Sequence, residues 1–162
     1  SIEIMAKALD NNPDVDFVYG NYYVVPRFGS TEGHIVDESG KAEWLTKGMI
    51  LGPFFMFRKS SIEKSGVFDE QLVSGADFDL ALRLAFNGKG MHISHILGYY
   101  LNEGLGASTR PDSKQPLERT VIELRYGLNV LEQNLVPVAL KYDVENIIVD
   151  GKKIPASNFR GE

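Results

Sequence analysis

The sequence predicts a mixed α/β domain, with an α+β arrangement as the alternative. Segments with apolar residues at helical spacing alternate along the chain with short runs rich in valine, tyrosine and phenylalanine. The chain has 162 residues, of which 43% are hydrophobic, and this is enough for one domain with a substantial core. We therefore expect a mixed sheet that is flanked by helices.

The first third of the chain predicts two strands or more, with a helix before them. Apolar residues at helical spacing predict a helix over residues 2–9. The run 15–25 predicts one bent strand or two strands joined at a Gly-Asn pair. Residues 27–40 are polar and contain three glycines, which indicates a surface hairpin or loop, and a short helix is expected over 41–47. Residues 54–57 are apolar and predict a buried strand.

The middle of the chain contains the clearest helix. After a short helix over 60–65, a second helix over 77–87 is apolar around most of its circumference, which is typical of a helix buried on most sides. Residues 91–101 predict one or two strands. Residues 102–115 predict a long loop with two glycines and a proline.

A leucine-rich seam dominates the last third. From Leu117 to Leu135, leucine and valine recur in alternating steps of four and three, which predicts an amphipathic helix over 114–136. We expect this helix to pack on its own domain, and self-association through the seam is the alternative. The tail, residues 137–162, predicts a β-hairpin around Asp150-Gly151.

The charge and composition exclude several classes of function. The formal net charge is −5, whereas proteins that bind nucleic acid usually carry a basic face. No apolar run approaches the ~20 residues that a transmembrane helix needs. The chain contains no cysteine, so it has no disulfide framework, thiolate metal site or cysteine nucleophile, and this composition fits a cytoplasmic protein.

Three segments in a fixed order closely resemble a known enzyme family. Residues 52–60 (GPFFMFRKS), 66–70 (GVFDE) and 74–84 (SGADFDLALRL) are similar to the second half of the family 2 glycosyltransferases. The resemblance spans about residues 1–110 and depends on the order and spacing of these segments. It implies a partial GT-A fold, which is Rossmann-like, with residues 1–113 forming the C-terminal, acceptor-side portion of the catalytic domain.

The resemblance implies an inverting transfer of a sugar from a nucleotide-diphosphate donor to an acceptor hydroxyl. The acceptor would be a carbohydrate or a lipid-linked molecule, and the role would be in polysaccharide biosynthesis, in the cytoplasm or at the cytoplasmic face of the membrane. A divalent cation, Mg²⁺ or Mn²⁺, would stabilise the diphosphate leaving group.

Asp77 matches the aspartate that this family uses as general base. The alternative from spacing alone is structural, because Ser74 and Asp77 also form a capping-box pattern at a helix start. The family usually has glutamate directly before this aspartate, and here the residue is Ala76. We interpret Asp79 as structural, since it lies one turn before Arg83 on the polar stripe.

The family's Asp-x-Asp metal motif is expected upstream of Ser1. Residues 14–16 have the same letters, but they precede a strand rather than follow one, so a solvated turn is the better interpretation. Glu103 is the candidate metal ligand inside the chain. The chain begins within a predicted helix and without methionine, and we therefore expect it to be a piece that is inactive alone.

Three further residues are candidates for substrate binding. Trp44 could be a stacking platform for an acceptor sugar, with core filling as the alternative. Ser108 and Arg110 lie in the predicted loop that would fold over the diphosphate as a mobile lid, and Arg110 could contact phosphate or be simply solvated. A second function remains open, a non-catalytic interaction module on a glycosyltransferase-like scaffold, because Ala76 and the leucine seam favour it.

Overall fold

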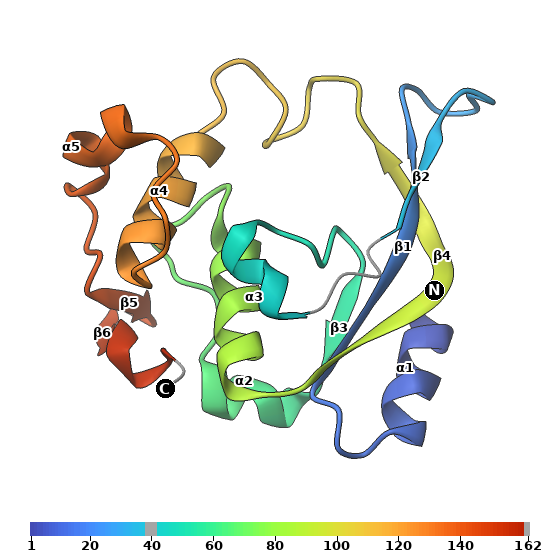
Figure 1. The fold of residues 1–162 in the computed structure, drawn as a ribbon, viewed down its shortest axis with the longest axis horizontal. Coiled ribbons are helices and arrows are strands. Elements are labelled where there is room, and N and C mark those ends of the chain that lie inside the picture. The colour runs from blue at the N-terminus through green and yellow to red at the C-terminus, as the bar shows by residue number, and fades with distance from the viewer. Residues whose placement is uncertain (38–41, 161–162) are drawn as a thin grey trace.

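The computed structural model describes residues 1–37 and 42–160, which form a mixed α/β arrangement (Figure 1). In the first half the elements are α1 (Ile2–Asn11), β1 (Phe17–Val25), β2 (His34–Val36), the 3₁₀ helix η1 (Ala42–Lys47), β3 (Phe55–Phe57), α2 (Lys59–Ser65) and α3 (Ala76–Asn87). In the second half they are β4 (Gly90–Leu101), α4 (Gln115–Arg125), η2 (Gln133–Leu135), α5 (Val136–Ala139), β5 (Asn146–Val149), β6 (Lys152–Pro155) and η3 (Ala156–Asn158).

Strand β1 is the centre of a four-stranded mixed sheet in the described residues. It pairs in parallel with β4, and antiparallel with β3 through its first half and with β2 through its second half. The predicted bend is a shift of register between Gly20 and Asn21 rather than a break into two strands. At Gly20 a Cβ atom would lie 2.8 Å from the carbonyl oxygen of Ile93, so the close approach of β1 and β4 requires glycine.

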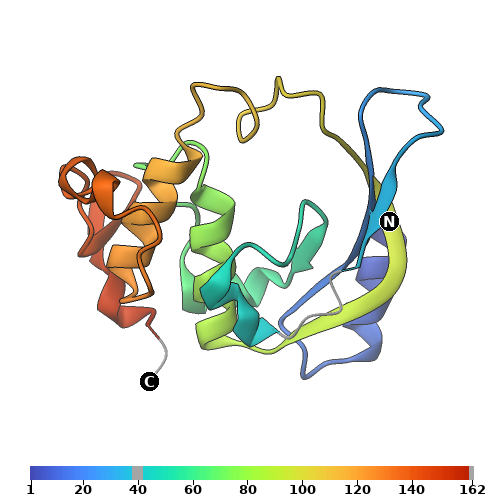
Figure 2. The same cartoon turned by 45° about the horizontal axis from the view of Figure 1, so that its top comes forward.

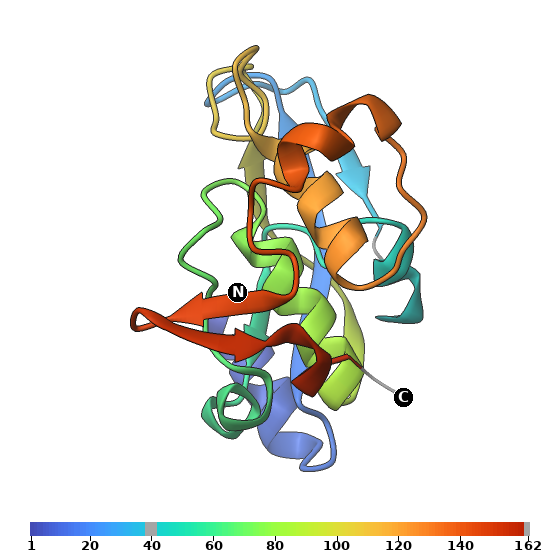
Figure 3. The ribbon, with the colours of Figure 1, turned by 90° about the vertical axis from the view of Figure 1, so that its left-hand side faces the viewer.

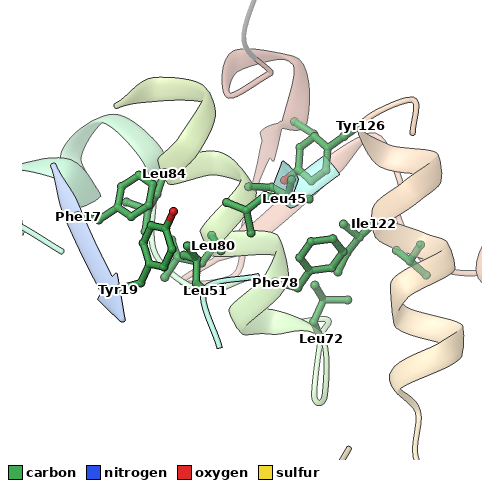
Figure 4. Close-up of a cluster of buried hydrophobic side chains, with 14 of the residues drawn as sticks. Phe17, Tyr19, Leu45, Leu51, Leu72, Phe78, Leu80, Leu84, Ile122 and Tyr126 are labelled. Atoms are coloured by element: carbon green, nitrogen blue, oxygen red, sulfur yellow. The ribbon is translucent and has the colours of Figure 1, made fainter. Parts of the chain in front are cut away.

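Helices cover both faces of this sheet, because side chains alternate between the two faces of a strand. Val18 of β1 packs with Met5 and Leu9 of α1 in one buried cluster. Phe17 and Tyr19 belong to a second cluster on the opposite face, where α3 lies (Figures 2 and 4). Helix α3 is buried on most sides, as predicted, and it therefore forms the middle of the molecule.

The expected helix over 114–136 is wrong in its length, because α4 ends at Arg125. Gly127 has φ +65°, its N–H donates to the carbonyl of Leu124, and the N–H of Leu128 donates to the carbonyl of Glu123. This pair of hydrogen bonds is the Schellman arrangement, which terminates a helix with a glycine in the left-handed region. The expected continuous seam from Leu117 to Leu135 is therefore divided, and its first half packs into the molecule's own core.

The C-terminal third shares a core with the sheet. Val121 and Ile122 of α4, Ala139 of α5 and Ala156 of η3 lie in the same buried cluster as Phe17. The predicted tail hairpin is confirmed as β5 and β6, and Figure 3 shows it lying across α3. The predicted buried strand over 54–57 is confirmed as β3, although its side chains are only half-buried. No helix among the described residues is both long and apolar enough to cross a bilayer.

A buried ionic network joins α3, α4 and the loop before α3. Arg125 lies 2.8 Å from the Asp69 carboxylate and 3.1 Å from that of Asp79, and Arg83 lies 2.7 Å from the other Asp79 oxygen. All four side chains are fully buried. The phenol of Tyr126 also donates to Asp79, at 2.6 Å. The structural interpretation of Asp79 as the partner of Arg83 is therefore confirmed.

The charges in this network are matched, and they hold the arginine in its charged form. Burial alone would lower the pKa of Arg125, but the neighbouring charges of Asp79 and Asp69 outweigh this effect and raise it. Burial also raises the pKa of Tyr126, with the Asp79 charge acting in the same direction, so the phenol remains a hydrogen-bond donor.

We predict that Arg125→Met lowers the free energy of unfolding by about 3–5 kcal/mol, because it leaves two buried carboxylates without their shared cation. Urea denaturation followed by circular dichroism measures this change. The control Lys7→Met removes the exposed pair between Lys7 and Glu3 and should cost no more than about 0.5 kcal/mol. A loss in Arg125→Met as small as that in the control would contradict the role assigned to the network.

Candidate functional site

Asp77 stands where two adjoining hollows meet. The larger hollow has a volume of about 680 Å³ and lies between the ends of β1 and β4, the start of α3 and the loop that follows β4. The smaller hollow has a volume of about 300 Å³ and lies between the starts of α3 and α4. Both are lined by Met49, Ser74, Asp77 and Gln115. These volumes are in the range of sites that bind small molecules.

The environment of Asp77 favours a proton acceptor. The residue is exposed, but the surrounding protein removes part of the hydration of its carboxyl group, and this desolvation raises its pKa. Hydrogen bonds from the backbone N–H groups of Phe78 and of Asp77 itself act in the opposite direction and are weaker. The contact with Phe78 is 2.8 Å long and uses one of about four acceptor positions of the carboxylate. The group can therefore still accept a hydrogen bond from a ligand.

A buried carboxylate from α4 holds the backbone directly before Asp77. Glu118 is fully buried and accepts hydrogen bonds from the N–H groups of Val73, Ser74 and Gly75 at 2.6–3.0 Å. These N–H groups lead into α3, where a negative charge is favoured by the helix dipole. The sequence did not identify Glu118, since a glutamate in the first turn of a helix is usually solvated and only the packing of α4 against residues 73–75 buries it.

The expected capping box at α3 is wrong. The residue that caps the helix is Gly75, and no side chain caps it. Ser74 instead uses its backbone N–H to donate to Glu118. Asp77 lies in the first helical turn, where its charge suits the helix dipole, but it is not part of a reciprocal cap. The structural alternative for Asp77 is therefore weaker than the spacing indicated.

Aromatic side chains form one wall of the larger hollow. Tyr22 of β1 and Tyr100 of β4 pack edge to face with ring centroids 6.2 Å apart. Gly52 makes room for Tyr22, because a Cβ atom there would lie 2.5 Å from the ring, and its φ of +65° also suits glycine. The sequence did not identify either tyrosine as a site residue, although tyrosine is frequent in the run 15–25, which contains Tyr22.

Of the residues predicted to bind substrate, one lies in the larger hollow and another lies on the surface. Ser108 lines the larger hollow, with its hydroxyl 3.3 Å from that of Tyr100. Arg110 is exposed, pairs with Asp112 at 3.2 Å and is not among the residues that line either hollow, which favours the solvated alternative. Trp44 lies in η1, but its side chain is outside the described residues. The loop 102–114 spans from β4 to α4 (Figure 2), and its residues Gly106 and Ser108 line the larger hollow.

The potential metal ligands of the described residues are dispersed. Among residues 1–37 and 42–160, no three carboxylate or imidazole side chains lie together as a metal-binding group. Glu103 is exposed in the loop after β4. Asp14 pairs with Lys89 at 2.6 Å, and Asp16 accepts the Lys89 N–H at 2.7 Å, which agrees with the prediction of a turn. The expected Asp-x-Asp motif upstream of Ser1 stays a prediction.

We predict that Glu118→Ala lowers the free energy of unfolding by about 2–3 kcal/mol, because three backbone N–H groups lose their acceptor. Chemical denaturation measures the loss, and faster amide exchange at Val73–Gly75 should accompany it. The control Glu63→Ala, at an exposed position on α2, should change stability by no more than about 0.5 kcal/mol. Unchanged exchange at Val73–Gly75 would show that Glu118 does not hold this segment.

Comparison with known proteins adds no family to this description. No protein-family model matches the chain, and no curated protein matches it. The resemblance of residues 52–84 to family 2 glycosyltransferases therefore rests on its own motifs and their spacing. The chemistry of the chain is best inferred from the cleft around Asp77 and from the groups that hold it.

Proposed function

We propose that this chain is the acceptor-side portion of an inverting glycosyltransferase with a GT-A fold, in which Asp77 is the general base. The observation that carries the proposal is the placement of Asp77, an aspartate with a raised pKa on the shared wall of two hollows. A carboxylate in this environment is a better proton acceptor than one in water. The motif order of residues 52–84 supports the same assignment.

In the proposed chemical step, the main contribution of this chain is the carboxylate of Asp77. Asp77 accepts the proton of the acceptor hydroxyl while that oxygen forms a bond to the anomeric carbon of the donor sugar. The bond from the anomeric carbon to the nucleoside diphosphate breaks on the opposite face, and the configuration inverts. Nucleoside diphosphate leaves with its electron pair, and the Asp77 proton passes to solvent. The expected cation would stabilise the leaving diphosphate.

The larger hollow suits a carbohydrate. Aromatic rings pack well against the C–H faces of sugars, and Tyr22 and Tyr100 provide such rings beside Ser108, whose hydroxyl can donate or accept hydrogen bonds. The loop 102–114 contributes Ser108, and a loop of this length can close over bound substrate. A carbohydrate or lipid-linked acceptor and a nucleotide-sugar donor are the partners that we propose, with a cytoplasmic location.

One observation favours a second function, a non-catalytic interaction module. Ala76 replaces the glutamate that the family usually places beside its base, and Glu118 supplies a carboxylate at the start of α3 that is fully committed to backbone N–H groups. A module would retain the cleft for binding without proton transfer. Substitution of Asp77 separates the two functions, because only the enzyme requires its carboxylate.

We predict that Asp77→Asn lowers kcat by about 10²–10⁴-fold in the intact protein that contains this chain. The assay measures release of UDP or GDP from a panel of nucleotide sugars with Mn²⁺ and carbohydrate acceptors. The control Asp10→Asn, on the exposed end of α1, should retain the wild-type rate. No release by the wild-type protein would favour the interaction module, whereas a near wild-type rate in Asp77→Asn would remove Asp77 as the base.

We also predict that Asp77→Asn does not destabilise the chain at pH 7 and raises its free energy of unfolding. A raised pKa in the folded state means that ionised Asp77 opposes folding. This cost is absent below the unfolded-state pKa of about 3.9 and is complete above the folded-state pKa. The gain from asparagine should therefore be present at pH 7 and vanish at about pH 3. Urea denaturation of both forms at the two pH values measures it, and a loss at pH 7 would contradict the raised pKa.

A further inference from the structure

The smaller hollow beside Asp77 has an apolar character that the transfer step does not use. Its lining includes the apolar residues Met49, Phe78, Pro116 and Leu131, beside polar residues such as Arg119. Leu131 lies in the wall of this hollow and is 64% exposed, so a ligand that fills the hollow would cover its side chain. A large apolar side chain left open at the wall of a hollow is typical of a site that a ligand covers.

The walls of this hollow are held in place by buried polar contacts. Glu123 is almost fully buried and accepts hydrogen bonds from Arg119 Nε and from the N–H of Leu131, both at 3.0 Å. Arg119 also donates to the carbonyl of Lys47 at 2.8 Å. These contacts join α4, the segment after it and the end of η1. The hollow is therefore formed before any ligand arrives, and the Arg119 guanidinium is already paired.

The position of the hollow identifies which part of a ligand would enter it. Asp77 belongs to the walls of both hollows, so a molecule whose hydroxyl meets Asp77 from the larger side can extend an apolar group into the smaller one. The volume of about 300 Å³ equals roughly ten water molecules at about 30 Å³ each, which admits a short alkyl chain or an aromatic ring.

We propose that the smaller hollow binds an apolar aglycone, an alkyl or aryl group attached to the sugar that carries the accepting hydroxyl. The substrate class is thus a glycoside with an apolar substituent rather than a free sugar. The identification of this ligand as the acceptor rests on the proposed function, but the binding of the apolar group does not.

Binding of two glycosides to this chain tests the proposal. n-Octyl β-D-glucoside, kept below the concentration at which it forms micelles, should bind at least about tenfold more tightly than methyl β-D-glucoside, since each buried CH₂ contributes a factor of about four. Titration followed by NMR should place the octyl chain at the methyl groups of Met49 and Leu131. Equal affinity for the two glucosides, or no binding of either, would overturn the proposal.

A matched pair of variants separates this site from general adsorption of detergent. Leu131→Asp should lower the affinity for the octyl glucoside at least about tenfold, because it replaces apolar wall with a charge. Leu140→Asp changes a similarly exposed leucine (57%), at the end of α5 and outside both hollows, and should bind like the wild type. Similar losses in both variants, or none in Leu131→Asp, would refute the site. If the chain binds the octyl glucoside and the Asp77→Asn variant remains active, only the assignment of Asp77 as base is wrong, and the apolar site stands.

Discussion

The pairing of Asp79 with two arginines is the constraint on which the rest of the arrangement depends. One oxygen of Asp79 faces Arg83 on its own helix, and the other faces Arg125 and Tyr126 on α4. Buried charges of this kind are stable only when each has its partner and its hydrogen bonds. Helix α4 can therefore pack on α3 in one register, the one that brings Arg125 to Asp79.

That register also determines how the start of α4 lies against the segment that leads into α3. Glu118, Ile122 and Arg125 are spaced four and three residues apart, so they lie on one face of α4. When Arg125 meets Asp79, this spacing brings Glu118 to the N–H groups before α3. The ionic network and the support of Asp77 are thus two ends of one helix–helix contact. Asp77 is therefore positioned by packing in the core rather than by a surface loop.

Prediction from the sequence succeeded where the pattern was local. Periodicity or spacing along one element predicts the course of β1, the buried helix α3, the tail hairpin and the pairing of Asp79 with Arg83. It failed where two local rules compete. The seam from Leu117 to Leu135 continues past Gly127, and only the left-handed conformation of that glycine ends the helix.

The site was predictable only in part for a related reason. Asp77 could be found because its neighbours along the chain form a motif. The other site residues lie far from Asp77 in the sequence. Strand pairing brings Tyr22 and Tyr100 to the same hollow, and helix packing brings Glu118 to the segment before Asp77. The Arg110 prediction depended on the place of its loop in the resembling family, whereas the side chain pairs with Asp112 on the surface.

The raised pKa of Asp77 is caused by desolvation, which outweighs the backbone hydrogen bonds to its carboxylate. A carboxylate at the start of a helix usually accepts several backbone N–H groups, and such contacts lower its pKa and weaken it as a base. Here Glu118 takes the N–H groups of Val73, Ser74 and Gly75. Those N–H groups precede α3, and at Asp77 itself desolvation has the largest effect on the pKa and raises it against the N–H groups of Phe78 and of Asp77, which lower it. The buried glutamate on α4 thus holds the three residues that lead into α3, while the carboxylate of Asp77 in the first turn retains acceptor positions that the Phe78 N–H does not occupy.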